Sequence, residues 1–136
     1  MLIMAIQGTA GSIRDQVVTQ LTKLPKQRVV TIDVSFHFDP NIRVATLEQL
    51  LHRRRDVVNV VTGADTALEL AFLRSNQALF CHVHGAYPQK LLRLPGGMKP
   101  GDVSVVPDGV AAPDWYLTPE EAFSELLIRR RRRRAA

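Results

Sequence analysis

The first stretch whose residue types could do chemistry is the glycine-bearing segment GTAGSIRD, Gly8–Asp15. It follows the short apolar run Met1–Ile6, and apolar residues then recur at helical spacing from Ile13 to Leu24. A strand, a small-residue turn and a helix start bring backbone N–H groups and the positive end of a helix to one point, which suits a phosphate. We therefore predict a nucleotide-binding loop made of Gly8, Thr9, Ala10, Gly11, Ser12, Ile13, Arg14 and Asp15.

This loop departs from the phosphate-loop pattern GxxxxGK[ST] at three positions. Counted from Gly8, Ile13 stands at the second glycine, Arg14 at the lysine, and Asp15 at the hydroxyl that usually binds magnesium. A β-branched residue does not easily adopt the backbone conformations of glycine, and a planar guanidinium does not replace a compact ammonium in a geometric site. The alternative interpretation is an ordinary strand-to-helix turn whose glycines serve close packing.

Four blocks of the chain, in the right order, resemble the phage-type deoxynucleoside monophosphate kinases. The first block, IQGTAGSIRDQVVTQL, is similar to the GKAGSGKDT-type loop of that family and matches it at Gly8, Ala10, Gly11, Ser12 and Asp15. The others are VSFHFDP, DVVNVVTGADTALELAFLRSNQALFCHVHG and VSVVPDGVAAPDWYLTPEEAFSELL. The resemblance implies a P-loop kinase-like fold, ATP and Mg²⁺ as weakly held cofactors, and a catalytic role for Arg14 if the chain is an enzyme.

Two departures from the family bear on activity. The residues after the third expected strand, Thr62–Ala64, include no charged group to face a phosphate, and the segment Gly85–Gly101 is too short for the lid of the family. We expect this segment to be a loop whose cations are Lys90, Arg93 and Lys99. The favoured hypothesis is a degenerate, non-catalytic relative, a pseudoenzyme that binds or regulates a protein or nucleic-acid partner. The alternatives are an active monophosphate kinase that uses ATP, and an α/β domain that binds nucleic acid.

Apolar and β-branched runs alternate with helical spacing along the chain. Strands are expected within residues 1–6, 28–38, 56–62, 78–84 and 103–107, with helices after the first three and a last helix from Thr118. This alternation predicts an α/β fold with three layers, a parallel sheet of about five strands covered by helices on both faces. Ligands of such sheets bind at the carboxyl ends of the strands, and the residues expected there are Gly8–Arg14, Asp39, Thr62, Gly63 and His84.

The spacing of apolar residues also assigns buried faces to two helices. The helix that leads into the basic cluster Arg53–Arg55 is expected to bury Val44, Leu47, Leu50 and Leu51. The next helix begins with the capping box of Thr66 and Glu69 and is expected to bury Leu68, Ala71 and Phe72.

The positive charge of the chain is concentrated at its end. The net charge is +5, yet six of the 18 basic residues form the run Arg129–Arg134, and the other 12 face 13 acidic residues. We therefore divide the 136 residues into one domain, 1–128, and an arginine-rich tail, 129–136. The tail residues that are candidates for nucleic-acid binding are Arg129, Arg130, Arg131, Arg132, Arg133 and Arg134. The alternative is a solubilising tail with no partner.

Cysteine and histidine usage favours neither a disulfide framework nor a metal site. Cys81 is the one cysteine, which fits a reducing compartment, and an apolar strand around it favours an inert thiol. His82 and His84 alternate on that strand, but only His37, Asp39 and His52 remain as further ligands, so no metal site is predicted.

The chain has no apolar run of about 20 residues and no basic leader, so no membrane partner is expected. We expect a cytoplasmic protein, located in the host-cell cytoplasm if it is phage-encoded.

Overall fold

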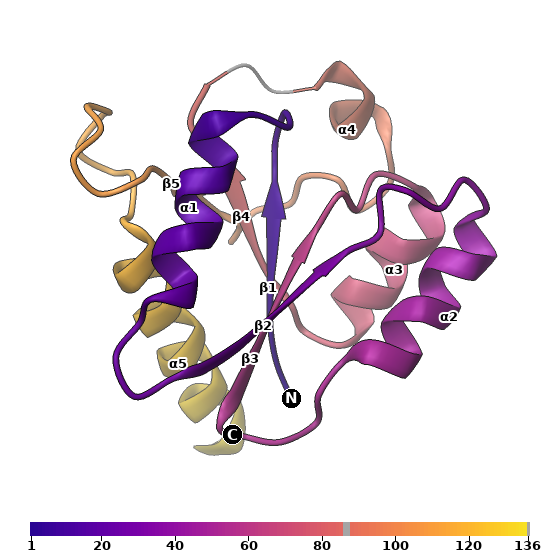
Figure 1. Cartoon of the computed structure of the whole chain (residues 1–136), viewed down its shortest axis with the longest axis horizontal. Helices are drawn as coiled ribbons and strands as arrows, with labels where there is room; N and C mark the ends of the chain where they lie inside the picture. The colour runs from indigo at the N-terminus through magenta and orange to yellow at the C-terminus, as the bar shows by residue number, and fades with distance from the viewer. Residues whose placement is uncertain (86–87, 136) are drawn as a thin grey trace.

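Five parallel strands form one sheet in a computed structural model that describes residues 1–85 and 88–135 (Figure 1). The strands are β1 (Leu2–Gln7), β2 (Arg28–Asp33), β3 (Val57–Thr62), β4 (Leu79–Val83) and β5 (Val103–Val105). The helices are α1 (Ser12–Thr22), α2 (Pro40–Leu50), α3 (Ala67–Ser75), α4 (Gln89–Arg93) and α5 (Pro119–Ala135). The order of strands across the sheet is β2-β3-β1-β4-β5, so β1 is central.

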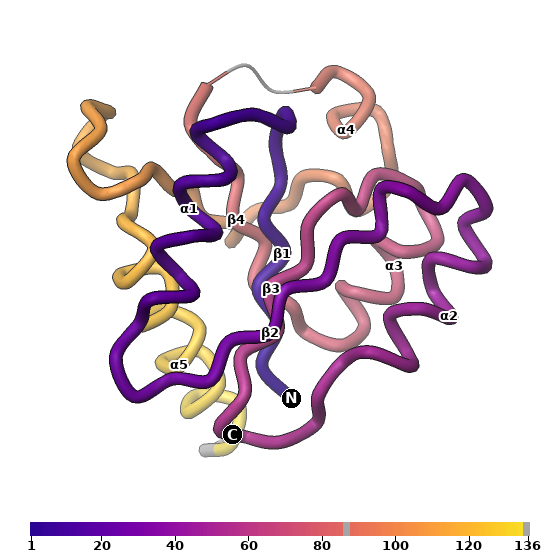
Figure 2. The backbone as a smooth tube through the Cα atoms, in the orientation of Figure 1, coloured from indigo at the N-terminus to yellow at the C-terminus, as the bar shows by residue number. Residues whose placement is uncertain are grey.

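Helices cover both faces of the sheet, as Figure 2 shows by the α1 and α5 traces on one side and the α2 and α3 traces on the other. Side chains of β1 alternate between two cores: Leu2 and Met4 pack with α1 and α5, and Ile3 and Ala5 pack with α2 and α3. Every residue of β1, β3 and β4 is buried, which explains why these strands read as apolar runs. The predicted three-layer parallel α/β fold is confirmed.

Element ends differ from the sequence prediction at three places. β2 stops at Asp33, so the residues from Val34 to Phe38 form its connection to α2. α2 ends at Leu50, before the basic cluster Arg53–Arg55. The segment Gly85–Gly101, expected to be a loop throughout, contains the five-residue helix α4, whose Leu91 side chain is buried in the core.

The arginine run continues the last helix. α5 extends to Ala135, with its residues Phe123 and Leu126 buried against the sheet. Arg129 and Arg130 are half-buried, whereas Arg131–Arg134 are exposed. In the part of the chain that the structure describes, no helix combines the length and the apolar character needed to cross a bilayer.

The predicted faces of α2 and α3 are only partly correct. Leu47 and Leu51 are buried as expected, whereas Leu50 and Leu68 are exposed. The positions that the prediction missed are Arg43 on α2 and Glu69, Leu70 and Leu73 on α3, which are buried. The two helices pack side by side, and each turns one charged residue toward the other. Apolar spacing cannot detect a face whose central residues are an ion pair.

Arg43 holds together the connections that follow β2 and β3. Its Nη1 donates to Glu69 Oε1 at 2.8 Å and to Asp65 Oδ1, and its other guanidinium nitrogens donate to the carbonyls of Ser35 and His37. The side chain of Glu69 is fully buried and that of Arg43 is 7% exposed. Glu69 Oε1 also accepts the backbone N–H groups of Asp65 and Thr66, as the predicted capping box requires.

We predict that Arg43→Met destabilises the protein by about 3–5 kcal/mol, because it leaves the Glu69 carboxylate buried without its cation. The measurement is the free energy of unfolding in urea. Arg54→Met is the matched control, because Arg54 pairs with Asp56 at 3.1 Å while both side chains are more than half exposed. The control should lose no more than about 1 kcal/mol. Equal losses in the two variants would contradict the role given to Arg43.

Candidate functional site

The loop from Gly8 to Gly11 lies at the carboxyl end of the central strand β1, between β1 and the start of α1 (Figure 1). The helices that follow β1 and its neighbour β3 lie on opposite faces of the sheet. In open parallel sheets, ligands bind where neighbouring crossovers diverge in this way. The predicted position of the loop is therefore the position at which this fold is expected to take a ligand.

Two glycines allow close approach of backbone at this edge. Gly8 has φ 140°, and a Cβ built there would lie 3.3 Å from the Cβ of Val83 in the neighbouring strand. Gly63 has φ 78°, and its Cβ would lie only 2.6 Å from the Cβ of Ser35. A side chain at either position would push the strand ends apart. Both glycines are thus needed for the shape of the edge.

The first turn of α1 has no side-chain cap. Gly11 occupies the N-cap position, its carbonyl accepts the first helical hydrogen bond from the Asp15 N–H, and both Gly11 and Ser12 are exposed. By contrast, α2 is capped by Asp39, and α5 by a reciprocal pair between Thr118 and Glu121. Uncapped amides at the positive end of a helix attract an anion.

Arg14 stands in the wall of three hollows around this helix start. One hollow of about 280 Å³ lies between the loop and the β3–α3 connection, one of about 190 Å³ lies between the loop and His84, and one of about 400 Å³ lies against the end of β2. The Nε atom of Arg14 is buried and has no hydrogen-bond partner in the described part of the chain. Arg14 also forms no ion pair with any residue in 1–85 or 88–135. Its cation is therefore not neutralised by a described acidic side chain.

The 280 Å³ hollow has a second cation and a carboxylate that is already engaged. Lys90 of α4 reaches its wall and donates to Asp65 Oδ2 at 3.3 Å, while Arg43 donates to the other oxygen of Asp65. Burial opposes the charge on Arg43, but the hydrogen bonds that Arg43 donates to Glu69 and Asp65 outweigh it and raise the pKa of Arg43. Asp65 thus faces two cations.

The predicted nucleotide-binding residues are only partly brought together as expected. Residues Thr9–Arg14 line the smallest hollow together with His84, and Gly8 and Gly63 line the 280 Å³ hollow. Asp15 and Thr62 lie in the wall of the 400 Å³ hollow. Asp39 was expected at the same site, but its side chain caps α2 at the Asn41 N–H. Ile13 lies in the first turn of α1, where its conformation is helical and needs no glycine.

The sequence did not reveal the role of Arg43 and Ser35 at this edge. A signal for Arg43 was present, because Arg43, Leu47 and Leu51 recur every four residues and line the buried side of α2. Apolar spacing does not count Arg43 as a buried residue, because an arginine is rarely buried without a charged partner and the sequence does not identify that partner. Ser35 carried no signal, since its place depends on the contact with Gly63.

The two strand histidines have different surroundings. His82 Nε2 lies 2.8 Å from Asp102 Oδ2, and Asp102 also accepts a bidentate pair of hydrogen bonds from Arg74. His84 stacks edge-on against Tyr116 with ring centroids 5.0 Å apart.

In residues 1–85 and 88–135, no group of three metal-ligating side chains converges. Burial raises the pKa of Cys81, as expected for an inert thiol.

No family model, no curated protein and no solved structure matches this chain.

We predict that Asp102 gives the protein an acid-sensitive stability. Burial alone would raise the pKa of Asp102, but the hydrogen bonds from Arg74, His82 and the Lys99 N–H lower it well below its ordinary value. A carboxyl with a lowered pKa stabilises the fold above its unfolded pKa of about 3.9, and this contribution is lost as the pH falls toward the folded pKa.

The measurement compares the unfolding free energies of wild type and Asp102→Asn in urea at several pH values. The advantage of wild type should shrink as the pH falls from about 5 to about 2. Asp114→Asn serves as a control, because Asp114 is exposed and forms no ion pair with a described residue. A wild-type advantage that stays constant down to the lowest pH would contradict the prediction.

Proposed function

We propose that this protein binds a phosphorylated ligand, a nucleotide in the first instance, at the loop Gly8–Arg14 and does not transfer its phosphate. The observation that carries the proposal is the uncapped first turn of α1 beside the buried Nε of Arg14, which has no hydrogen-bond partner among residues 1–85 and 88–135. Backbone amides and a guanidinium that converge on one hollow are complementary to phosphate oxygens. The proposed role is that of a binding or regulatory protein, a degenerate relative of the phage-type deoxynucleoside monophosphate kinases.

The small size of each hollow at the loop favours phosphate binding over recognition of a whole nucleoside within one hollow. The hollow between the loop and His84 has a volume of about 190 Å³, and the neighbouring hollow of about 280 Å³ shares Thr9, Ala10 and Arg14 with it. Drug-sized ligands usually occupy pockets of about 300–1,000 Å³. We therefore propose that the phosphates of the ligand bind in these hollows and that its sugar and base lie outside them, toward solvent.

Phosphoryl transfer makes further demands that this edge meets poorly. The reaction needs a metal ion held by protein oxygens, cations around the transferred group and closure that excludes water. Asp65, the carboxylate in the wall of the hollow of Arg14 and Lys90, is engaged by Arg43 and Lys90, and the helix above the edge, α4, has five residues. This arrangement favours binding over turnover. The alternative is an active monophosphate kinase that takes ATP and Mg²⁺ at the same loop.

We predict that Arg14→Gln weakens the affinity for ATP, GTP and inorganic pyrophosphate by at least about tenfold, because a charged hydrogen bond to a phosphate contributes about 1.5–3 kcal/mol. The measurement is isothermal titration with and without magnesium. Lys23→Gln is the matched control, since Lys23 is an exposed cation at the other end of α1. Equal affinities of wild type and Arg14→Gln would mean that the loop Gly8–Arg14 does not bind the phosphates of the ligand.

We also predict that coupled assays with ATP and each common deoxynucleoside monophosphate give only background turnover. The physical reason is that Asp65, the carboxylate in the hollow of Arg14 and Lys90, is already bound by Arg43 and Lys90, and that the edge carries a short α4 in place of a closing lid. Turnover that disappears in Arg14→Gln would establish the kinase alternative. Binding in the titrations without turnover in the assays supports the binding protein.

A further inference from the structure

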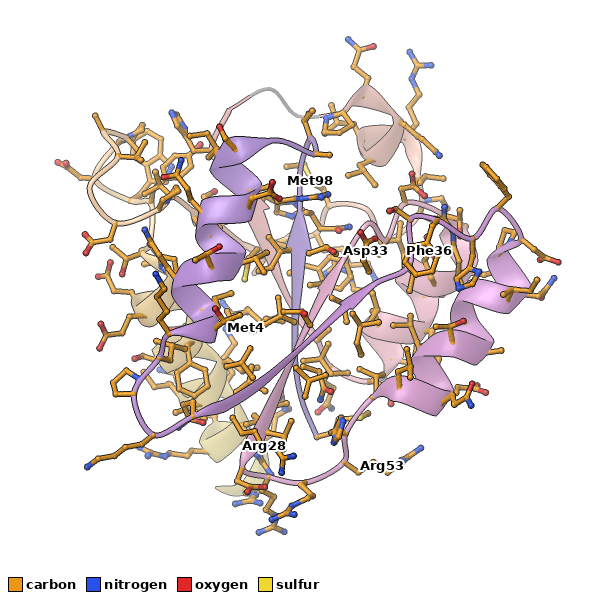
Figure 3. All side chains as sticks on the ribbon, viewed as in Figure 1. Met4, Arg28, Asp33, Phe36, Arg53 and Met98 are labelled. Carbon is orange, nitrogen blue, oxygen red and sulfur yellow. The ribbon has the colours of Figure 1, made fainter. Side chains whose placement is uncertain are left out.

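A second group of cations lies at the amino edge of the sheet, opposite the Gly8–Arg14 loop. The register pairs Leu2 with Val58 and Arg28 with Val57, so the starts of β1, β2 and β3 lie together. Figure 3 shows Arg28 and Arg53 at this end of the molecule, where both chain termini lie in Figure 1. Three segments far apart in the sequence therefore meet at one edge.

The last turns of α5 are fastened to this edge. Arg129 Nη1 donates to the carbonyl of Gly101, which precedes β5, at 2.6 Å, and its Nε donates to Glu125 at 2.9 Å. The residues that follow Arg129 thus continue from a fixed point beside the strand starts. The arginine run therefore starts on the folded surface, as the continuation of α5.

The cluster Arg53–Arg55 is positioned by a buried amide. The side chain of Asn59 accepts the His52 N–H at 2.8 Å and donates to the carbonyls of His52 and Leu2, each at 2.9 Å. Asn59 is fully buried, so these bonds do not compete with water. They fix the connection between α2 and β3 against the start of β1.

Most cations at this edge have no acidic partner. Arg54 pairs with Asp56 and Arg129 pairs with Glu125, but no described residue forms an ion pair with Arg53, Arg55 or Arg130–Arg134. Burial lowers the pKa of Arg130, and repulsion from Arg134, Arg55 and Arg133 lowers it further. The pKa of the Met1 amino group is lowered by burial and by repulsion from Arg130 and Arg55 in the same way. A bound polyanion would relieve this repulsion.

We infer that the amino-edge surface, formed by Arg53, Arg55 and Arg130–Arg134, binds the phosphate backbone of a nucleic acid. Guanidinium groups pair bidentately with phosphates, and the exposed side chains from Arg131 to Arg134 include no apolar group that would enter a membrane. The exposed aromatic residues Phe36, Phe38 and Trp115 follow the carboxyl ends of β2 and β5, so none stacks on a base here. Binding is therefore independent of base sequence.

The surface is distinct from the proposed ligand site, because the two lie at opposite edges of the sheet. Arg55 and Arg93 provide a matched pair of test positions, since both are exposed arginines and Arg93 lies on α4 at the carboxyl edge. Loss of either removes one positive charge from the protein. Only Arg55 belongs to the amino-edge surface.

The experiment measures fluorescence anisotropy of a labelled, random-sequence DNA duplex with the full chain over a series of salt concentrations. We expect the slope of log affinity against log salt to become shallower by about one for Arg55→Gln and to stay unchanged for Arg93→Gln. A variant in which Arg131, Arg132, Arg133 and Arg134 are all replaced by glutamine should lose most of the binding. Glutamine preserves helix propensity, and unchanged urea midpoints would show that each variant folds.

Three results would overturn the inference. An unchanged slope for Arg55→Gln would mean that the cluster Arg53–Arg55 does not take part. Binding that persists in the variant with four glutamines would mean that the end of α5 is not part of the nucleic-acid-binding surface. Binding of phosphatidylserine vesicles, or of polyglutamate, as tight as that of the duplex at equal salt would mean that the surface is not built for a nucleic acid.

Discussion

The ion pair between Arg43 and Glu69 is the contact on which the carboxyl edge of the sheet depends. Both side chains lie inside the fold, and a buried charge is tolerated only with a partner. Because Arg43 also binds the carbonyls of Ser35 and His37 and the carboxylate of Asp65, the connections after β2 and β3 cannot separate without exposing charge. Ser35, Gly63 and Asp65 form one wall of the hollow beside Arg14. The shape of that hollow is therefore set by a contact outside the loop.

Both edges of the sheet carry positively charged groups, but of different kinds. At the carboxyl edge they are the uncapped amides of α1, with Arg14 and Lys90 beside them. At the amino edge they are side chains, and the arginines at the end of α5 also meet the negative end of that helix. A small hollow with converging donors suits a compact phosphate group, whereas an exposed surface with many cations suits an extended polyanion.

The buried networks also explain where apolar spacing misled the prediction of helix faces. The expected face of α2 included Leu47, which is buried, but also Leu50, which is exposed, and it left out Arg43, which is buried. The expected face of α3 included Leu68, whereas the structure buries Glu69 and Leu70. In each helix, the buried face is rotated about the helix axis relative to the predicted face. The rotation turns a charged residue, Arg43 or Glu69, toward its partner on the other helix. A pattern that counts apolar residues treats such a position as exposed.

Features that depend on neighbouring residues could be predicted from the sequence. Apolar runs buried on both faces indicate β1, β3 and β4, glycine indicates the turn at Gly8, and Thr118 indicates the start of α5. The strand order, which places Lys90 beside the loop and brings the cluster Arg53–Arg55 to the end of α5, is visible only in the folded chain. Local sequence does not encode this order, because parallel strands are joined by long crossovers that can reach different neighbours. The hydrophobic effect is also non-directional, so an apolar side chain is buried equally well beside any neighbouring strand.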